Sequence, residues 1–239
     1  MPTEGTHTAR AEIKVFTSNS TRSVLGALVP QFERSSGHKV SITADPAKVM
    51  MERISGGERG DVAILGTTAI DELAKAGLVE PKSRRRFARC RVGVAILQGA
   101  PRPDISTVDA FRRALLNAKS ICHTEHGASG MYVPVLLERL GILEQMKPKI
   151  VTRPGGYIAR VVVEGEAELA IQQIVELLSV PGVDLVGPIP DEVQKTFQTS
   201  AAIFTASKAP AAAEALLQSL LQPSSAGVFR DKGLDPIAD

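Results

Sequence analysis

The segment 125–130, Glu-His-Gly-Ala-Ser-Gly, places two titratable side chains directly before a predicted helix start. Imidazole titrates near neutral pH and a neighbouring carboxylate can hold its tautomer, so His126 and Glu125 are candidates for acid/base chemistry. Gly130 permits close approach of the backbone to a ligand, and Ser129 adds a hydroxyl group. The alternative is that His126 is a solvated loop residue that caps a backbone group.

Hydroxyl side chains also stand where predicted strands become helices. Ser18 and Ser20 follow the strand Glu12–Phe16, and Thr67 follows the strand Asp61–Leu65. The free amides of a first helical turn and the helix dipole favour an anion at such a junction. These positions, with Ser129, therefore predict a small-anion site, although each hydroxyl could instead be a plain N-cap.

Strand-like and helix-like runs alternate along the chain, which predicts a layered α/β protein. We expect Asp45 to cap a helix that has Pro46 at its first position, and Thr67-Thr68 to cap another. The predicted strands are Glu12–Phe16, Lys39–Thr43, Asp61–Leu65, Arg89–Leu97, Ser120–Cys122, Leu169–Ile171, Val183–Val186 and Ala201–Phe204. The predicted helices are Val24–Phe32, Val49–Ile54, Ile70–Ala76, Val108–Ala118, Val133–Leu140, Tyr157–Glu164 and Ala211–Leu221.

Composition excludes several classes of protein. The chain has 239 residues, and its 28 basic and 26 acidic residues leave a net charge of +2, which gives no overall field for nucleic acid. The basic run Lys82–Arg91 contains one aromatic residue, too few for a stacking platform, so we expect solvated edge or hinge surface there. Apolar runs fall short of the roughly 20 residues of a membrane span. We expect no nucleic-acid partner and no membrane-embedded segment.

Metal, nucleotide and cofactor motifs are missing from the sequence. Cys90 and Cys122, and the pair His123 and His126, fit no metal-ligand spacing, so we expect no metal and no cofactor. The two cysteines could pair or stay free. The first ten residues lack a secretory signal, which leaves either a cytoplasmic chain or one whose export signal has been trimmed.

Five segments together resemble the periplasmic molybdate-binding-protein family in order and spacing. They are Phe16–Ser20, Gly57–Ile64, Glu164–Leu169, Val186–Pro190 and Lys232–Pro236. The resemblance covers most of the chain and implies an α/β fold of the type II periplasmic binding protein class, with two lobes and a ligand cleft between them. It further implies that residues 12–90 and 191–239 form one lobe and residues 91–190 the other, in a monomer.

The residues aligned with that family favour a different ligand from molybdate. Ser20 matches a serine that contacts molybdate in the family, but a second such serine falls at Pro46-Ala47 and a contacting tyrosine falls at Gln173. Lys48, Arg160 and the amide pair Gln172-Gln173 could instead bind carboxylates by charge-assisted hydrogen bonds. The alternative for Lys48 and Arg160 is that they lie on exposed helix faces. We therefore expect a solute-binding protein for a di- or tricarboxylate, with a molybdate-like oxyanion less favoured.

An enzyme class resembles the same family, namely aconitate isomerase, which moves a double bond by an allylic proton shift. In that alternative Glu125, His126 or Lys48 would move the proton, while Lys48, Arg160 and helix-start amides would hold the carboxylates. The binding-protein interpretation implies a periplasmic location and an ABC-transporter permease as partner. The lack of an export signal favours the enzyme somewhat.

Overall fold

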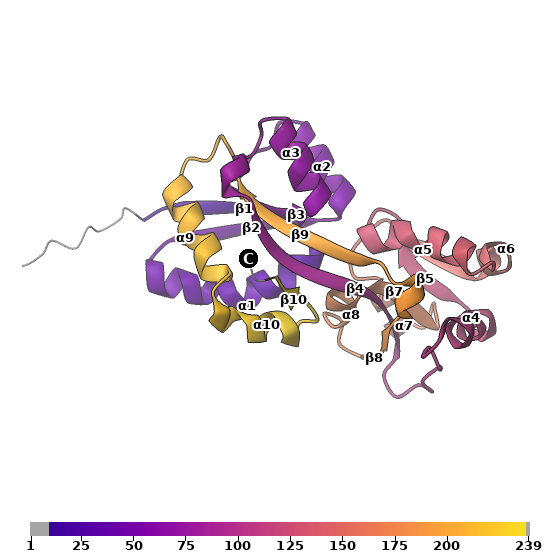
Figure 1. The fold of residues 1–239 in the computed structure, drawn as a ribbon. Coiled ribbons are helices and arrows are strands. Elements are labelled where there is room, and N and C mark those ends of the chain that lie inside the picture. Colours follow the sequence, from indigo (N-terminus) through magenta and orange to yellow (C-terminus); the bar gives the residue numbers. More distant parts are fainter. Residues whose placement is uncertain (1–9, 238–239) are drawn as a thin grey trace, which may run out of the picture.

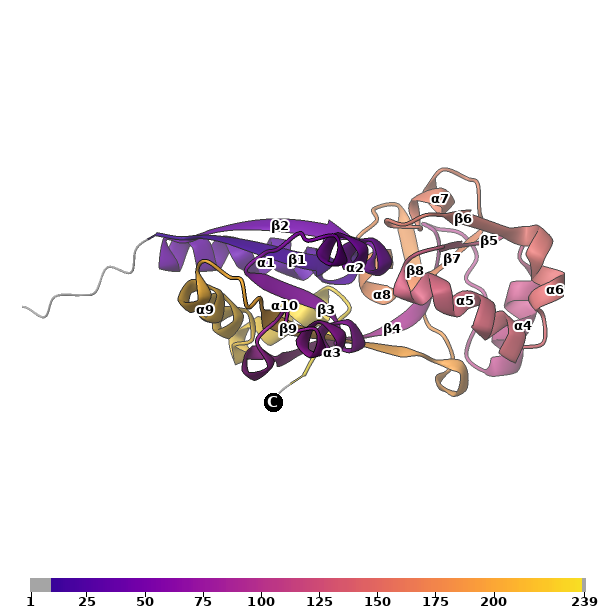
Figure 2. The ribbon, with the colours of Figure 1, turned by 90° about the horizontal axis from the view of Figure 1, so that it is seen from above.

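The computed structural model describes residues 10–237, and residues 1–9, on which the export-signal expectation rests, lie outside the described residues. Two α/β lobes lie side by side and are connected by the long strands β4 (Arg85–Leu97) and β9 (Thr196–Ile203), as Figure 1 and Figure 2 show. The first half of β4 pairs with β9, and its second half pairs with strands of the other lobe. This strand therefore belongs to both sheets.

The first lobe has a sheet with helices on both faces. Its strands are β2 (Lys39–Asp45), β1 (Glu12–Ser18) and β3 (Val62–Gly66), which are parallel, and the antiparallel β9, β4 and β10 (Asp235–Pro236). One face carries α1 (Asn19–Ser36), α9 (Pro210–Leu220) and α10 (Ala226–Asp231), and the other carries α2 (Ala47–Ser55) and α3 (Thr67–Lys75). Alternation along the strands explains both layers, because Val15 packs with α1 while Phe16 packs with α2 and α3.

The second lobe repeats this layering around a smaller sheet. Its strands β7 (Leu169–Gln173), β5 (Ile121–Thr124), β6 (Ile150–Arg153) and β8 (Val183–Pro188) run in the same direction, and β4 lies between β7 and β8, antiparallel to both. One core contains side chains of α4 (Val108–Asn117), α5 (Ala128–Arg139) and α6 (Leu143–Met146). A second core contains side chains of α7 (Arg160–Val163) and α8 (Ile174–Leu177). Short 3-10 turns lie at Pro81–Ser83, Lys147–Lys149, Asp191–Val193 and Pro223–Ser225.

Several parallel strands lead directly into helices at the edge that faces the other lobe. Strand β1 ends at Ser18 and α1 begins at Asn19, while β3 ends at Gly66 and α3 begins at Thr67. Strand β7 passes into α8 in the same way. Ligands of open α/β sheets bind outside the carboxyl ends of such strands, so these junctions locate the candidate site.

Three local predictions are wrong. Asp45 is the last residue of β2, and its carboxylate accepts a hydrogen bond of 2.6 Å from Arg53 instead of capping α2, whose N-cap is Pro46. Thr67 is already inside α3, whose N-cap is Gly66. The helix expected at 157–164 is observed only at Arg160–Val163. The residues before it form a tighter turn, in which the Arg160 amide donates to the carbonyl of Tyr157, three residues earlier.

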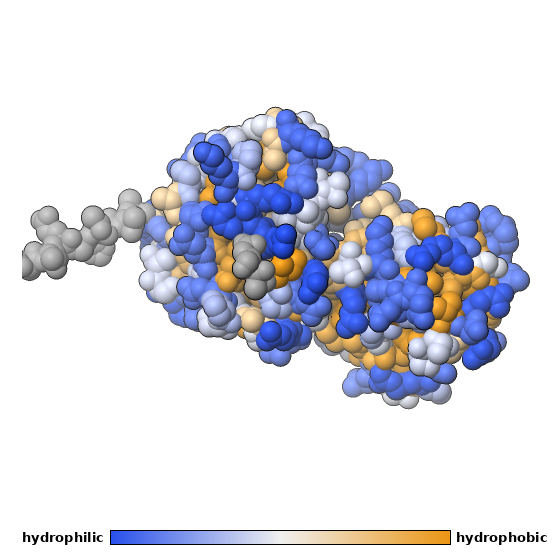
Figure 3. Space-filling view, viewed as in Figure 1, coloured by the Kyte–Doolittle hydropathy of each residue, from blue (hydrophilic) through white to orange (hydrophobic). Residues whose placement is uncertain are grey.

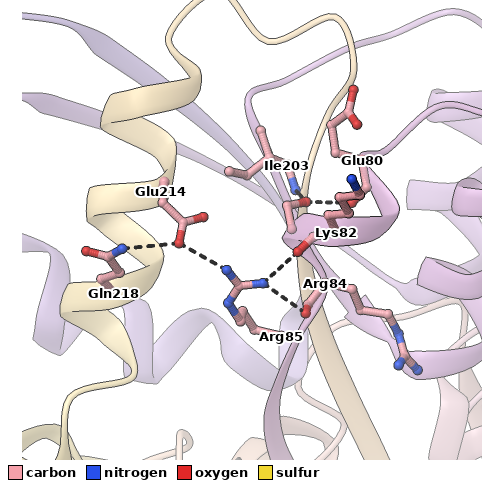
Figure 4. A network of polar contacts seen from close by, with 8 residues as sticks. Glu80, Lys82, Arg84, Arg85, Ile203, Glu214 and Gln218 are labelled. Atoms are coloured by element: carbon pink, nitrogen blue, oxygen red, sulfur yellow. Dashed lines mark hydrogen bonds and ion pairs between the residues drawn. The ribbon is translucent and has the colours of Figure 1, made fainter.

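The basic run of the sequence forms the start of β4 and the turn before it. Arg85 donates to Glu214 of α9 at 3.1 Å and to the backbone carbonyl of Lys82 at 2.9 Å, as Figure 4 shows. These bonds tie α9 to the first half of β4. The strand is four residues longer at its N-terminal end than the predicted strand Arg89–Leu97.

The molecular surface differs between the two lobes. The large apolar side chains that are exposed are Leu97, Met131, Val135, Val163 and Leu178, all in segments of the second lobe. Figure 3 shows larger apolar areas over that lobe than over the first. Within residues 10–237, no helix has the length and apolarity that crossing a membrane requires. The lobe boundaries at residues 90 and 190 stay a prediction.

Candidate functional site

A narrow cleft of about 70 Å³ lies between the lobes and receives residues from both. The first lobe contributes the ends of β1, β2 and β3, and the second contributes the ends of β5 and β7 and the loop after β6. The lining residues are Ser18, Asn19, Ser20, Pro46, Ala47, Gly66, Thr124, Gly127, Ala128, Gly155, Gly156, Gln172, Gln173, Glu176, Phe197, Gln198 and Thr199. Most of them are small or polar and neutral, so backbone groups and side-chain amides dominate the lining.

Four helices of nine residues or more begin at this cleft. The N-cap residues are Ser18 for α1, Pro46 for α2, Gly66 for α3 and Gly127 for α5, and none of them accepts a side-chain capping bond. Of the other two helices of this length among the described residues, α4 is capped by the Thr107 side chain, whereas α9 has no side-chain cap and begins with Pro210, which has no amide proton. Uncapped amides in the first turn of a helix carry partial positive charge. Four helix N-termini that converge on one cleft therefore favour an anionic ligand.

Hydroxyl and amide groups complete the lining. The Ser18 and Ser20 hydroxyls lie 2.9 Å apart in a mutual hydrogen bond at the start of α1. Thr124 is buried at the end of β5, lines the cleft, and its Oγ1 has no hydrogen-bond partner. The Gln172 side chain accepts from the Ile158 amide at 3.0 Å and donates to the Gly156 carbonyl at 2.8 Å. Gln172 therefore fixes the Gly155-Gly156 loop, whereas the buried Thr124 hydroxyl has no partner among residues 10–237.

Glu176 is the one ionisable side chain in the lining. It lies in α8, directly after β7, and is 6% exposed. Burial raises the pKa of its carboxyl group to about 8, and the backbone amide of Gln173 acts against that increase. No Lys or Arg side chain within residues 10–237 forms an ion pair with it. The group is therefore largely protonated and neutral at pH 7.

The structure brings three of the predicted ligand-binding residues into the cleft, namely Ser18, Ser20 and Gln173. Ser129 and Gly130 lie immediately behind it. Ser129 is fully buried and its hydroxyl lacks a partner, and a Cβ at Gly130 would lie 2.6 Å from the carbonyl carbon of Thr124. The close approach that Gly130 permits is therefore made by the backbone of its own lobe.

The other predicted residues lie outside the cleft lining. Lys48 is 56% exposed, and its amino group lies 3.9 Å from Glu52 on the outer face of α2. Arg160 is exposed at the start of α7. The Thr67 hydroxyl bonds to the Ser200 hydroxyl at 2.9 Å, in the wider groove that opens from the cleft. Their roles in binding stay predictions.

The predicted acid/base pair occupies the loop between β5 and α5. The Glu125 carboxylate accepts a hydrogen bond of 2.7 Å from Thr152, and the His126 backbone amide donates to the Pro154 carbonyl at 3.1 Å. Gly127, the next residue, lines the cleft, whereas Glu125 and His126 lie next to the lining and are not part of it. Catalytic roles for Glu125, His126 and Lys48 stay predictions.

Sequence reasoning missed Glu176, Thr124 and the Gly155-Gly156 loop. A pattern for Glu176 was present, because it is one carboxylate within the apolar run from Leu169 to Val180. Thr124 and Gly155 had no such pattern, since they reach the cleft only through the pairing of β5 with β6 and β7.

The two cysteines are both free and buried, Cys90 in β4 and Cys122 in β5. Burial raises the pKa of each thiol to about 12. Neither residue lines the cleft. Both thiols are therefore protonated at neutral pH and belong to the packing of the strands.

Comparison with known proteins agrees with this architecture. The family model described as bacterial extracellular solute-binding protein matches residues 13–235. An aconitate isomerase from Pseudomonas sp. is 35% identical over 231 residues, which cover 94% of this chain and 88% of that protein. The molybdate-binding protein ModA of Azotobacter vinelandii is 26% identical, over 93% of this chain and 89% of its own length.

A solved structure shows the same fold. The periplasmic molybdate-binding protein of Azotobacter vinelandii superimposes with a TM-score of 0.79 at 18% identity, covering 95% of this chain and 99% of that one. This likeness confirms the predicted type II periplasmic binding protein fold, and the family match confirms the resemblance on which that prediction was based. The chain belongs to the bacterial extracellular solute-binding protein family.

Proposed function

We propose that this chain binds a small di- or tricarboxylate in the cleft between its lobes. The observation that carries the proposal is the convergence of four helix N-termini without side-chain caps on one lining. Each offers backbone donors to a negatively charged oxygen. A ligand with several carboxylates can reach amides from both lobes at once, which would stabilise their approach.

The loss of two hydroxyl ligands of the molybdate-binding family favours carboxylates over a compact tetrahedral oxyanion. Two positions at which the molybdate-binding family has hydroxyl ligands carry Pro46-Ala47 and Gln173 here, and all three residues line the cleft. Pro46 offers no donor, so a tight shell around one small anion is incomplete. The 35% identity to an aconitate isomerase supports the same ligand class, because aconitate is a tricarboxylate.

Isothermal titration at pH 7 with trans-aconitate, cis-aconitate, citrate, molybdate and sulfate tests the ligand class. We expect a carboxylate to bind most tightly, and Ser20→Ala to weaken it about tenfold or more, the usual effect of losing a hydrogen bond to a charged group. Ser35→Ala is the matched control, because Ser35 lies at the far end of α1 and its hydroxyl bonds to the Phe32 carbonyl. Binding of molybdate or sulfate alone would contradict the ligand class, and an unchanged affinity in Ser20→Ala would contradict the site.

A second candidate function is interconversion of the aconitate isomers. The identity to an aconitate isomerase over nearly the whole chain favours it. The reaction would take a proton from the methylene carbon, delocalise the charge over the allylic unit and its carboxylates, and return a proton to the opposite carbon, with no net change in composition. Proton NMR of trans-aconitate with a catalytic amount of the chain tests it, since appearance of the cis isomer shows turnover and an unchanged spectrum excludes it.

We also propose that the chain acts outside the cytoplasm and delivers its ligand to an ABC-transporter permease. The description of its family as extracellular solute-binding proteins supports this. Fractionation of cells that express the full-length gene product tests the location. Recovery in the cytoplasmic fraction alone would contradict the transport role and leave the enzyme as the better account.

A further inference from the structure

Glu176 is a buried acidic residue in the cleft lining, and no Lys or Arg of residues 10–237 forms an ion pair with it. The residue is 6% exposed and lines the cleft together with Gln172 and Gln173. A carboxylate in such a place would repel an anionic ligand, and nearby positive charge would be needed to offset it. No Lys or Arg of the described residues pairs with Glu176, so an ionised carboxylate does not explain the position of this residue.

The titratable groups around Glu176 do not supply that charge. A charge on Glu176 would raise the pKa values of Cys90 in β4 and of Tyr157 before α7. Burial raises both pKa values as well, so both groups are neutral near pH 7. Arg22 of α1 and Arg160 act on Tyr157, and Asp235 acts on Cys90, but none of the three shifts Glu176 itself. The local field at Glu176 is set by burial and by the Gln173 amide.

We propose that Glu176 binds the ligand as a neutral carboxylic acid, donating its proton in a hydrogen bond to a carboxylate oxygen of the anion. The inference rests on the proposed function, because it assigns a role to one residue of the same cleft. A protonated acid adds a hydrogen-bond donor to the lining without adding negative charge. Hydrogen bonds to a charged acceptor are the strong ones, so this donor would matter for affinity.

Ligand binding is then linked to proton uptake. The carboxyl pKa of Glu176 is raised to about 8, so the free protein is mostly protonated at pH 7 and mostly ionised at pH 9. If only the protonated form binds, the affinity falls about tenfold between pH 7 and pH 9, and about tenfold for each further pH unit. Over the same range the carboxylates of trans-aconitate stay ionised, so the ligand contributes no such change.

Titration calorimetry with trans-aconitate at pH 7, 8 and 9 tests the proposal. Each pH is measured in two buffers of different ionisation enthalpy, which gives the number of protons taken up by the wild-type chain without any mutation. We expect almost no uptake at pH 7 and close to one proton per ligand at pH 9. The variant Glu176→Gln retains a hydrogen-bond donor, so we expect its affinity to stay the same from pH 7 to pH 9.

Glu80→Gln is the matched control, because Glu80 is exposed in the first lobe, far from the cleft lining. It should retain the wild-type pH dependence. Wild-type binding that neither weakens nor takes up a proton between pH 7 and pH 9 would overturn the role of Glu176, and so would a Glu176→Gln variant with the wild-type pH dependence. Failure of every carboxylate to bind at any pH would instead overturn the proposed function.

Discussion

Gly155 and Pro46 come from different lobes and meet across the cleft. Gly155 lies in the loop after β6, and Pro46 is the N-cap of α2. A Cβ built on Gly155 would lie less than 3.0 Å from the proline ring, closer than real Cβ atoms approach other atoms. Gly155 is not among the glycines with positive φ, so alanine fits its backbone. We expect Gly155→Ala to hold the lobes further apart at this point.

The size of the effect follows from the cost of overpacking. Adding a methyl group to a close contact costs about 1–3 kcal/mol, because the rigid proline ring cannot rotate away. If the ligand complex requires this contact, the dissociation constant rises about 5- to 150-fold. The ligand-free chain escapes the clash by opening the lobes, so its melting temperature should change by no more than about 2 °C.

Calorimetry with trans-aconitate measures the affinity, and thermal unfolding without ligand measures the stability. Gly26→Ala is the control, because a Cβ at that exposed position of α1 would meet nothing within 4 Å. Small-angle X-ray scattering adds a third measurement, since ligand should shrink the radius of gyration of the wild type more than that of Gly155→Ala. An unchanged dissociation constant would refute the reasoning, and so would a variant that loses as much stability without ligand as with it.

Three further outcomes are expected. Gly130→Ala should lower the free energy of unfolding by about 1–3 kcal/mol even without ligand, because its Cβ would lie 2.6 Å from the Thr124 carbonyl carbon of the same lobe. Chemical denaturation measures this free energy, and a variant as stable as the wild type would contradict the prediction. A thiol reagent at pH 8 should modify neither buried cysteine in the native chain and both after denaturation, whereas fewer than two in the denatured, unreduced chain would indicate a disulfide. The raised pKa of Glu176 means that the folded chain binds more protons than the unfolded chain between about pH 4.5 and 8, so stability falls as pH rises through that window, by up to about 1.4 kcal/mol per pH unit. Glu176→Gln should remove that contribution, and equal slopes of melting temperature against pH in both proteins would count against it.

Sequence patterns predicted most of the strands and helices because alternation and helical spacing are local properties, but they missed strands β6 and β10 and helices α6, α8 and α10. They placed Ser18 and Ser20 at a strand-to-helix junction for the same reason, and both serines line the cleft. Side-chain direction was harder to predict. Ala47 lines the cleft, but the next helical residue is rotated by about 100° about the axis, so Lys48 lies near Glu52 instead. One residue of uncertainty in where α2 begins therefore changes which side chain of its first turn is predicted to face the cleft.

The convergence of the helix starts depends on information that no single segment contains. Gly127 becomes a cleft residue because β5 pairs in parallel with β6 and β7, and Pro46 meets Gly155 only because β4 and β9 connect the lobes.

This geometry also explains the charges of the cleft lining. Backbone dipoles supply the positive potential, so the cleft can hold an anion without a lysine or arginine in its lining. A carboxyl group is compatible with that arrangement only while it keeps its proton, and burial of Glu176 provides this up to about pH 8. Under the two proposals, the proton on Glu176 and the uncapped helix starts contribute to the binding of the same anion, and removing either should weaken that binding.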